Sequence, residues 1–445
     1  MENFWDNLSE DLKGCLVKAA SVPHLLSFLK EADSMDLLLL LDQARKIKKR
    51  KDLKSPPINS DFYDIQYLLP EDDRKILTKV REFMLAEVQP IANEYWLKAE
   101  FPFQIINGLK KLNIVNLTLD RSIGGQGKSY LLEGMIAEEI ARTDTSICTF
   151  FGVHSGLAMN SIDLCGSDEQ RQKFLPPMMS LDKIGAFGLT EPDVGSAASM
   201  GLKTTCKRSG DTWTITGQKK WIGNATFADY IIIWAKDVDD NHVKGFIVDR
   251  ETEGLKTEKI EDKMSLRTVQ NALITLNNIK VKEERRLQKA NSFKDTAAVL
   301  KKTRAGVAWQ AVGCARGAYE NTLAYTLKRE QFGRLIAGFQ ITQDMLAQML
   351  SQLTAMQSMV ARLSQLQDLG KLSDEQASLA KIFCTVNCRQ ITSMSRELMG
   401  GNGILISNNV GRFLADAEAL YSYEGTKQIN SLVVGRAITG MSAFT

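Results

Sequence analysis

The segment Tyr421–Asn430 contains the group in this chain that is best suited to proton transfer. It reads Tyr-Ser-Tyr-Glu-Gly-Thr-Lys-Gln-Ile-Asn, so the carboxyl group of Glu424 directly precedes a glycine, and Lys427 is the other charged residue. A carboxylate on a flexible turn with few charges around it can serve as a general base, because burial raises its pKa. Glutamate–glycine pairs are common on protein surfaces, so the interpretation depends on what accompanies this one.

Four other short segments accompany it in order along the chain. They are Phe-Gly-Leu-Thr-Glu-Pro-Asp-Val-Gly-Ser at 187–196, Trp-Ile-Gly-Asn at 221–224, Arg-Glu-Gln-Phe-Gly at 329–333 and Gly-Gly-Asn-Gly at 400–403. Together with Tyr-Glu-Gly-Thr at 423–426 they resemble the acyl-CoA dehydrogenase and oxidase family of flavoproteins. The resemblance covers roughly residues 60–445 and is strongest to glutaryl-CoA dehydrogenases and to the short-chain acyl-CoA oxidases of plants. Segments at 100–103, 269–271, 307–310 and 435–436 are similar to the oxidase branch in particular.

The elements that must position these segments follow from the spacing of apolar residues. Helical spacing runs from about 70 to 181 and again from about 296 to the end, and the period changes to two between about 203 and 281. This agrees with the α+β fold that the resemblance implies: an N-terminal helical domain, a middle antiparallel β domain and a C-terminal four-helix bundle. We expect these domains at 56–186, 187–290 and 291–445, after a helical extension and basic linker at 1–55.

Composition sets the limits of this interpretation. A chain of 445 residues with 44% hydrophobic and 24% charged residues is typical of a soluble globular protein of two or three domains. Seven basic residues at 45–54 account for the net charge of +3, so we expect no nucleic-acid partner. No apolar run approaches the ~20 residues of a transmembrane helix. The seven scattered cysteines favour a reducing intracellular compartment and no metal site, with peroxisome, mitochondrion and cytoplasm all left open.

The resemblance implies FAD-dependent α,β-desaturation of an acyl-CoA to the trans-2-enoyl-CoA, a reaction of fatty acid β-oxidation and lipid metabolism. Glu424 matches the family's base, which removes the α-proton while hydride passes from the β-carbon to flavin N5. The backbone N–H of Gly425 would then point towards the thioester carbonyl. Some members carry their base immediately before the arginine that corresponds to Arg304, but this chain has Thr303 there.

The resemblance also assigns the cofactor and substrate contacts. For FAD they are Leu189, Thr190, Gly195, Ser196, Trp221, Ile222, Gly223, Arg329, Phe332, Gln340, Glu397, Gly400, Gly401, Thr426 and Gln428. For acyl-CoA they are Cys148, Ser196, Arg304 and Gly425. Because the adenosine half of FAD would contact a neighbouring subunit, a homo-oligomer is expected, with a dimer of dimers favoured. A surface ion pair is the alternative for Arg304.

Three departures from the family pattern refine the expectation. Cys148 replaces the arginine with which glutaryl-CoA dehydrogenases pair the distal carboxylate, and an unpaired buried carboxylate would cost several kcal/mol, so a short, uncharged acyl chain is favoured. Gly223 replaces a threonine or serine, which removes a donor to the flavin and is expected to open space that bears on oxygen access. Glu397 replaces a glutamine, which leaves its role in question.

Several functional alternatives stay open from the sequence. The electron acceptor is either O2, as in an oxidase, or an electron-transferring flavoprotein, as in a dehydrogenase. Gly223 and the likeness to plant oxidases favour the oxidase, whereas the C-terminal Ala-Phe-Thr, which is not a peroxisomal address, argues against it. Two further readings are a flavin oxidase acting on a non-CoA substrate and a scaffold without catalysis.

Overall fold

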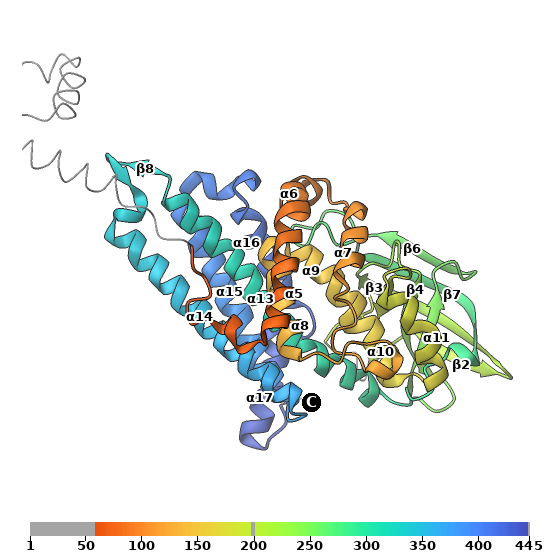
Figure 1. The fold of residues 1–445 in the computed structure, drawn as a ribbon. Helices are drawn as coiled ribbons and strands as arrows, with labels where there is room; N and C mark the ends of the chain where they lie inside the picture. The colour runs from red at the N-terminus through yellow and green to blue at the C-terminus, as the bar shows by residue number, and fades with distance from the viewer. Residues whose placement is uncertain (1–57, 197–200, 444–445) are drawn as a thin grey trace, which may run out of the picture. The chain divides into compact units, whose positions relative to one another are not determined.

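The computed structural model describes residues 58–196 and 201–443, which belong to one compact unit (Figure 1). The helical extension and basic linker expected at 1–55 lie outside the described residues. Helices form both ends of the described sequence and the strands lie between them, as the periodicity predicted.

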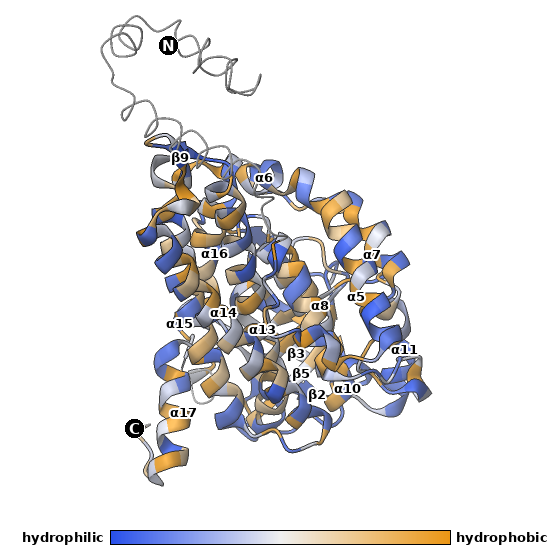
Figure 2. Cartoon of the chain, turned by 60° about the vertical axis from the view of Figure 1, so that its left-hand side comes forward, coloured by the Kyte–Doolittle hydropathy of each residue, from blue (hydrophilic) through white to orange (hydrophobic). Residues whose placement is uncertain are grey.

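The N-terminal part is helical. Its elements are η1 (Ile65–Leu68), α5 (Glu71–Phe83), η2 (Met84–Val88), α6 (Gln89–Lys98), η3 (Phe103–Ile105), α7 (Ile106–Leu112), η4 (Arg121–Ile123), α8 (Tyr130–Thr143), α9 (Thr145–Phe151), η5 (Gly152–Met159), α10 (Asn160–Cys165) and α11 (Asp168–Met179). Ser129 and Asp144 begin α8 and α9 by accepting hydrogen bonds from the backbone N–H groups of Leu132 and Ile147. Helix α5 alternates apolar and polar residues (Figure 2), whereas nearly all of α8 is buried.

The middle part is a seven-stranded sheet in the order β1-β4-β2-β3-β7-β6, with β5 paired to β4. The strands are β1 (Gly185–Gly188), β2 (Thr205–Ser209), β3 (Thr212–Ile222), β4 (Tyr230–Asp237), β5 (Val243–Asp249), β6 (Leu255–Lys259) and β7 (Ala272–Lys282). Most pairs are antiparallel, as expected, but β1 and β2 both pair with β4 in parallel. Alternating burial has the same period in either direction, so the sequence pattern could not reveal these two pairings.

The C-terminal part returns to helices after the short turn η6 (Glu283–Arg285). Its elements are α13 (Phe293–Thr326), β8 (Glu330–Gln331), β9 (Arg334–Leu335), η7 (Ile336–Gly338), α14 (Gln340–Asp368), α15 (Asp374–Leu398), η8 (Gly400–Ile404), η9 (Ile406–Asn408), α16 (Val410–Ser422) and α17 (Lys427–Thr439). Ser292 and Ser373 form capping boxes that fix the first turns of α13 and α15. None of the helices in the described part of the chain has the length and apolar character that a bilayer crossing requires.

Helices α8 and α13 approach each other closely because glycines lie where they cross. A Cβ atom on Gly313 of α13 would lie 2.3 Å from the carbonyl oxygen of Glu138 and 2.7 Å from the Cβ of Ala141, both on α8. On α8, a Cβ atom at Gly134 would lie 2.1 Å from the indole nitrogen of Trp309. The helices therefore cannot carry larger residues here without moving apart.

We predict that Gly313→Ala destabilises the protein, since the added methyl group meets backbone atoms of α8 that cannot move independently. Overpacking of this kind costs about 1–3 kcal/mol. The matched control is Gly306→Ala on the same helix, where the new Cβ meets nothing within 4 Å and where alanine should gain up to about 1 kcal/mol in helix propensity. Urea unfolding of both variants measures the difference, and equal stability of the two would contradict the packing argument.

Candidate active site

Glu424 lies in the turn between α16 and α17, with a backbone φ of 49° that non-glycine residues rarely adopt. Two side chains from other helices hold this turn through the carbonyl oxygen of Gly425. Lys381 of α15 donates to it from Nζ at 2.6 Å, and Asn430 of α17 donates from Nδ2 at 2.8 Å. Hydrogen bonds from α15 and α17 to this one carbonyl oxygen thus fix the unusual backbone conformation.

The carboxyl group of Glu424 has one close hydrogen-bond partner. The hydroxyl oxygen of Thr303 lies 2.7 Å from its Oε2 and can donate to it. Burial raises the pKa of Glu424, and the Thr303 hydrogen bond opposes part of that rise. The positive charges of Lys381 and Arg304 act in the same direction as Thr303, and burial itself lowers the pKa of Lys381 to about 8. A carboxylate with a raised pKa beside a cavity is suited to accepting a proton.

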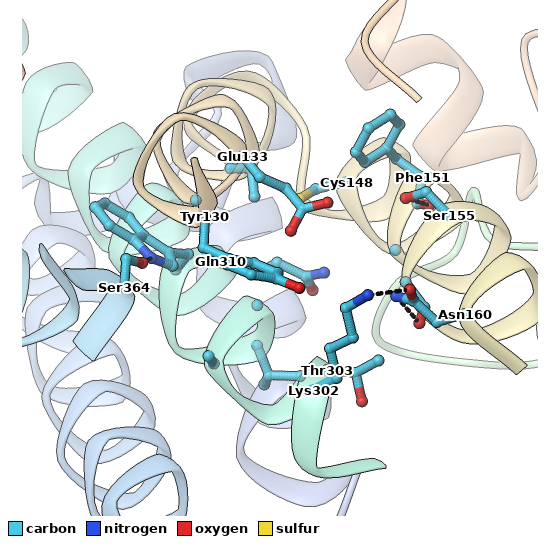
Figure 3. Close-up of a pocket in the computed structure, with 18 of the residues that line it drawn as sticks. Tyr130, Glu133, Cys148, Phe151, Ser155, Asn160, Lys302, Thr303, Gln310 and Ser364 are labelled. Atoms are coloured by element: carbon cyan, nitrogen blue, oxygen red, sulfur yellow. Dashed lines mark hydrogen bonds between the residues drawn. The ribbon is translucent and has the colours of Figure 1, made fainter. Parts of the chain in front are cut away.

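A cavity opens beside Glu424 and runs between α8, η5 and α13 (Figure 3). Besides Glu424 it is lined by Tyr130, Glu133, Gly134, Ala137, Cys148, Phe151, Gly152, Ser155, Gly156, Asn160, Lys302, Thr303, Ala305, Gly306, Val307, Trp309, Gln310, Ser364 and Gln367. Glu424 and Cys148, which the sequence assigned to base and acyl pocket, therefore line the same cavity. The Cys148 thiol is buried, lies 3.2 Å from the Ala137 carbonyl oxygen, and has its pKa raised by burial, so it is neutral.

The segment after β1 is anchored by a buried ion pair that the sequence analysis did not identify. Lys219 of β3 is fully buried and donates from Nζ to the carbonyl oxygen of Leu189 at 3.0 Å and to Oε1 of Glu191 at 2.8 Å. Glu191 also accepts hydrogen bonds from the backbone N–H groups of Lys203 and Thr204. Burial opposes it, but Lys219 and these hydrogen bonds hold the pKa of Glu191 below its usual range. The pair fixes the backbone on both sides of Thr190.

The end of β3 presents the residues expected to lie against a flavin ring. The Lys220 backbone N–H donates to the Thr190 carbonyl oxygen at 2.8 Å, so the two predicted flavin segments are neighbours. Trp221 is 53% exposed with φ of 66°, whereas Ile222 beside it is buried. The ammonium group of Lys220 lies 5.5 Å from the centre of the Trp221 ring, so the indole is half-exposed with a cation over one face. Gly195 and Ser196 are exposed, and among the described residues a Cβ at Gly195 would meet nothing within 4 Å.

Two valines limit the space at Gly223. A Cβ atom there would lie 3.2 Å from a methyl carbon of Val153 and 3.5 Å from one of Val269, because η5 and the segment before β7 pack onto the end of β3. Gly223 lacks a hydroxyl donor, and its bearing on oxygen access stays a prediction.

The residues assigned to the adenosine half of FAD lie elsewhere on the protein. Arg329 and Phe332 belong to the β8–β9 hairpin at the end of the helices that faces away from the sheet (Figure 1), and Phe332 is 93% exposed. The other exposed members of this group are Gln340, Glu397, Gly400 and Gly401. Since Trp221 is on the sheet, one chain does not bring the two groups together. The expectation that a neighbouring subunit completes the site stays a prediction.

Two other predicted residues have local partners. Arg304 forms an ion pair with Asp374 at the start of α15, but its side chain is only 13% exposed, so this is not the surface pair named as the alternative, and among the described residues its Nε has no hydrogen-bond partner. Thr426 caps α17 by accepting from the backbone N–H of Ile429 at 3.3 Å. Gln428 is exposed on the first turn of that helix. A structural role is therefore visible for Arg304 and Thr426, and their assignment to substrate and cofactor remains a prediction.

Sequence reasoning missed four charged residues around the site: Glu133, Lys219, Lys302 and Lys381. Each lies on a helix or strand where an exposed charge would be the ordinary expectation. A signal was present for Lys219, because it occupies the same alternate positions of β3 as the buried Trp213 and Ile215. The other three carry no such signal, since only the packing of distant helices turns them inward.

Comparisons with known proteins identify the family to which these features are similar. Three family models match consecutive parts of the chain: the N-terminal domain of acyl-CoA dehydrogenase at residues 70–182, its middle domain at 186–279 and its C-terminal domain at 293–439. A 3-(aryl)acrylate reductase from Clostridium sporogenes is 33% identical over 82% of this chain and 97% of its own length. A caffeyl-CoA reductase–Etf complex subunit, CarC of Acetobacterium woodii, is 32% identical over 82% and 97%.

Solved structures agree with the sequence comparisons. The glutaryl-CoA dehydrogenase of Mycobacterium smegmatis is 34% identical, with a TM-score of 0.83 over 87% of this chain and all of that protein. A second glutaryl-CoA dehydrogenase structure from that organism, in complex with FADH2, is 32% identical with the same TM-score over 86% and 98%. The N-terminal helical, middle β and C-terminal helical arrangement predicted from the sequence is thereby confirmed.

We predict that Thr303→Val moves the acid limb of the pH–rate profile to higher pH. The Thr303 hydroxyl stabilises the ionised carboxylate, so its removal raises the pKa of Glu424 and leaves less of the base ionised at low pH. A hydrogen bond to a charged group contributes about 1.5–3 kcal/mol, which is large enough for the displacement of the acid limb to be measured. Thr303→Ser keeps the hydroxyl and is the control. An unchanged profile of kcat/KM in the valine variant would show that Thr303 does not tune the base.

Proposed function

Because the chain belongs to the acyl-CoA dehydrogenase family of FAD-dependent oxidoreductases that act on CH–CH donors, we propose that it desaturates a short, uncharged acyl-CoA to the trans-2-enoyl-CoA. The observation that carries this proposal is the position of Glu424. It is a half-buried carboxylate with a raised pKa, at a cavity whose other lining includes the neutral thiol of Cys148.

Glu424 acts as the base that takes the α-proton. The α-proton of a thioester is a very weak acid, so the carboxylate must be desolvated and the developing enolate must be stabilised. Burial supplies the first condition, and the hydrogen bond from Thr303 keeps the carboxylate oriented. The backbone N–H of Gly425 is the donor that we assign to the thioester carbonyl oxygen. FAD, when bound, supplies the acceptor for the hydride of the β-carbon.

The residues placed for the cofactor divide into two sets. Leu189, Thr190, Trp221, Ile222 and Gly223 would hold the ring, because the buried pair of Lys219 and Glu191 fixes their segment. The exposed set on the β8–β9 hairpin, on α14 and at the end of α15 would meet the adenosine half of FAD in another subunit. Assembly into a homo-oligomer follows from this proposal, since a single chain would leave the cofactor half bound, and a dimer of dimers is the form that we favour.

The lining of the cavity limits the acyl group. At Cys148 a dicarboxylate would meet a neutral thiol, and the cation that lines the cavity, Lys302, is accompanied by the carboxyl group of Glu133, which disfavours a second carboxylate. The large side chains of Tyr130, Phe151 and Trp309 also line the cavity and restrict the length of the chain. A short, uncharged acyl chain satisfies both conditions.

Two electron acceptors remain within the proposal. The missing hydroxyl at Gly223 favours O2, although Val153 fills the space beside it. An electron-transferring flavoprotein is supported by the name of the Acetobacterium woodii relative, which is a subunit of a complex with Etf.

We predict that Glu424→Gln folds and binds FAD but loses turnover of butanoyl-CoA by several orders of magnitude, because an amide cannot accept the proton. The matched control is Glu418→Gln on α16, whose carboxylate forms a half-exposed ion pair with Arg389 and should change the rate little. Steady-state rates with a dye as acceptor measure both variants. Turnover near the parent level in Glu424→Gln would assign the base to another residue.

We expect the acceptor to be decided by adding butanoyl-CoA without oxygen and then admitting air. Bleaching of the yellow flavin absorbance on mixing supports the desaturation itself. Recovery of the absorbance within seconds, with formation of H2O2, identifies an oxidase. Persistence for minutes, with recovery on addition of an electron-transferring flavoprotein, identifies a dehydrogenase.

A further inference from the structure

The cavity beside Glu424 carries two opposite charges that the desaturation does not use. Glu133 extends into it from α8, and Lys302 extends into it from the first turns of α13 (Figure 3). Tyr130 lies between them, and its ring centre is 5.7 Å from the Lys302 ammonium group. A pocket that receives only a hydrocarbon chain would be expected to have an apolar lining.

Glu133 keeps unused capacity for hydrogen bonds. Its Oε1 accepts from the Thr118 hydroxyl at 3.1 Å, and among the described residues this carboxylate has no ion pair within 4 Å. Burial raises the pKa of Glu133, and the nearby charge of Lys302 opposes part of that rise. The second carboxylate oxygen therefore faces the cavity with no protein donor.

Lys302, which carries the opposite charge, is also largely buried and also keeps unused capacity for hydrogen bonds. Its side chain is only 15% exposed, and Nζ donates to Oδ1 of Asn160 at 2.7 Å. The nearest carboxylate oxygen belongs to Asp163 at 3.9 Å, beyond hydrogen-bond distance. An ammonium group has three N–H donors, and a second one is directed to the Tyr130 side chain, so one remains for a group inside the cavity.

The two charges decide which acyl groups fit. An alkyl end would remove water from both charges and replace none of its hydrogen bonds, which is unfavourable. A second carboxylate would be repelled by Glu133, and an ammonium group by Lys302. A hydroxyl group is neutral and can donate to Glu133 while it accepts from Lys302.

We propose that the substrate is a short acyl-CoA that carries a hydroxyl group beyond its β-carbon, recognised by Glu133 and Lys302. This inference rests on the desaturation proposed above and adds the chemical class of its acyl chain. Thr303 follows Lys302 directly and contacts Glu424, so α13 presents the hydroxyl-binding lysine and the partner of the base from adjacent positions.

The test compares 5-hydroxypentanoyl-CoA with hexanoyl-CoA, which have equal numbers of chain atoms and differ by a hydroxyl in place of a methyl group. The holoenzyme is expected to prefer the hydroxylated chain at least ~10-fold in kcat/KM, because a site built to bind a hydroxyl discriminates strongly against its absence. Equal values, or a preference for hexanoyl-CoA, overturn the inference, as does turnover of neither chain by an enzyme that is active on butanoyl-CoA. Inactivity on all three thioesters refutes the desaturation itself.

Two variants test whether Glu133 and Lys302 produce the preference for the hydroxylated acyl chain. Glu133→Leu and Lys302→Met are each expected to lower the preference for the hydroxylated chain ~10-fold or more, and Glu133→Leu to improve hexanoyl-CoA. Lys301→Met is the matched control on the same helix, because Lys301 does not line the cavity. Retention of the full preference in both variants overturns the assignment. If a variant fails to fold, the selectivity of the unaltered enzyme still decides.

Discussion

The site depends on keeping one carboxylate away from water without leaving it unable to react. Glu424 meets this constraint through groups from separate helices: Thr303 holds the carboxylate, and Lys381 and Asn430 hold the carbonyl of the next residue. A positive φ at a glutamate costs of order 1–3 kcal/mol and persists only when its surroundings enforce it. Three of the C-terminal helices, α13, α15 and α17, therefore each contribute a hydrogen bond that holds this turn.

A second segment of the site, the one that follows β1, is also held by buried polar groups. Strands β1 and β2 pair with successive parts of β4 along one edge, so the chain must leave that edge between them. The departing segment begins with Leu189 and Thr190, and the fully buried Lys219 holds it through a carbonyl oxygen and Glu191. Buried ion pairs of this kind contribute little net stability but fix a geometry. Here the pair fixes the backbone around Thr190, whose carbonyl oxygen accepts a hydrogen bond from the backbone N–H of Lys220, the residue before Trp221.

The sequence predicted the order of helical and β regions, because periodicity is a local signal. Short motifs also singled out Glu424 and Cys148, which the structure places on one cavity, and their roles as base and acyl contact stay predictions. The sequence could not predict the parallel pairing of β1 and β2 with β4, which has the same period as antiparallel pairing. It also missed Glu133 and Lys302, since a charged residue on a helix is ordinarily solvated and only the placement of distant helices turns these inward. For the same reason it could not predict that Val153, from a different element, lies beside Gly223.

The glycine contacts between α8 and α13 have a bearing on how this cavity could change over evolution. The backbones of the two helices lie close together at Gly313, and Gly134 lies against Trp309. The distance between the two helices is therefore fixed by these contacts. A change of substrate would then require exchange of the cavity-lining side chains on these helices. Reversal of the charge at position 133 or 302 would change which acyl groups the cavity binds, while the packing of α8 on α13 stayed the same.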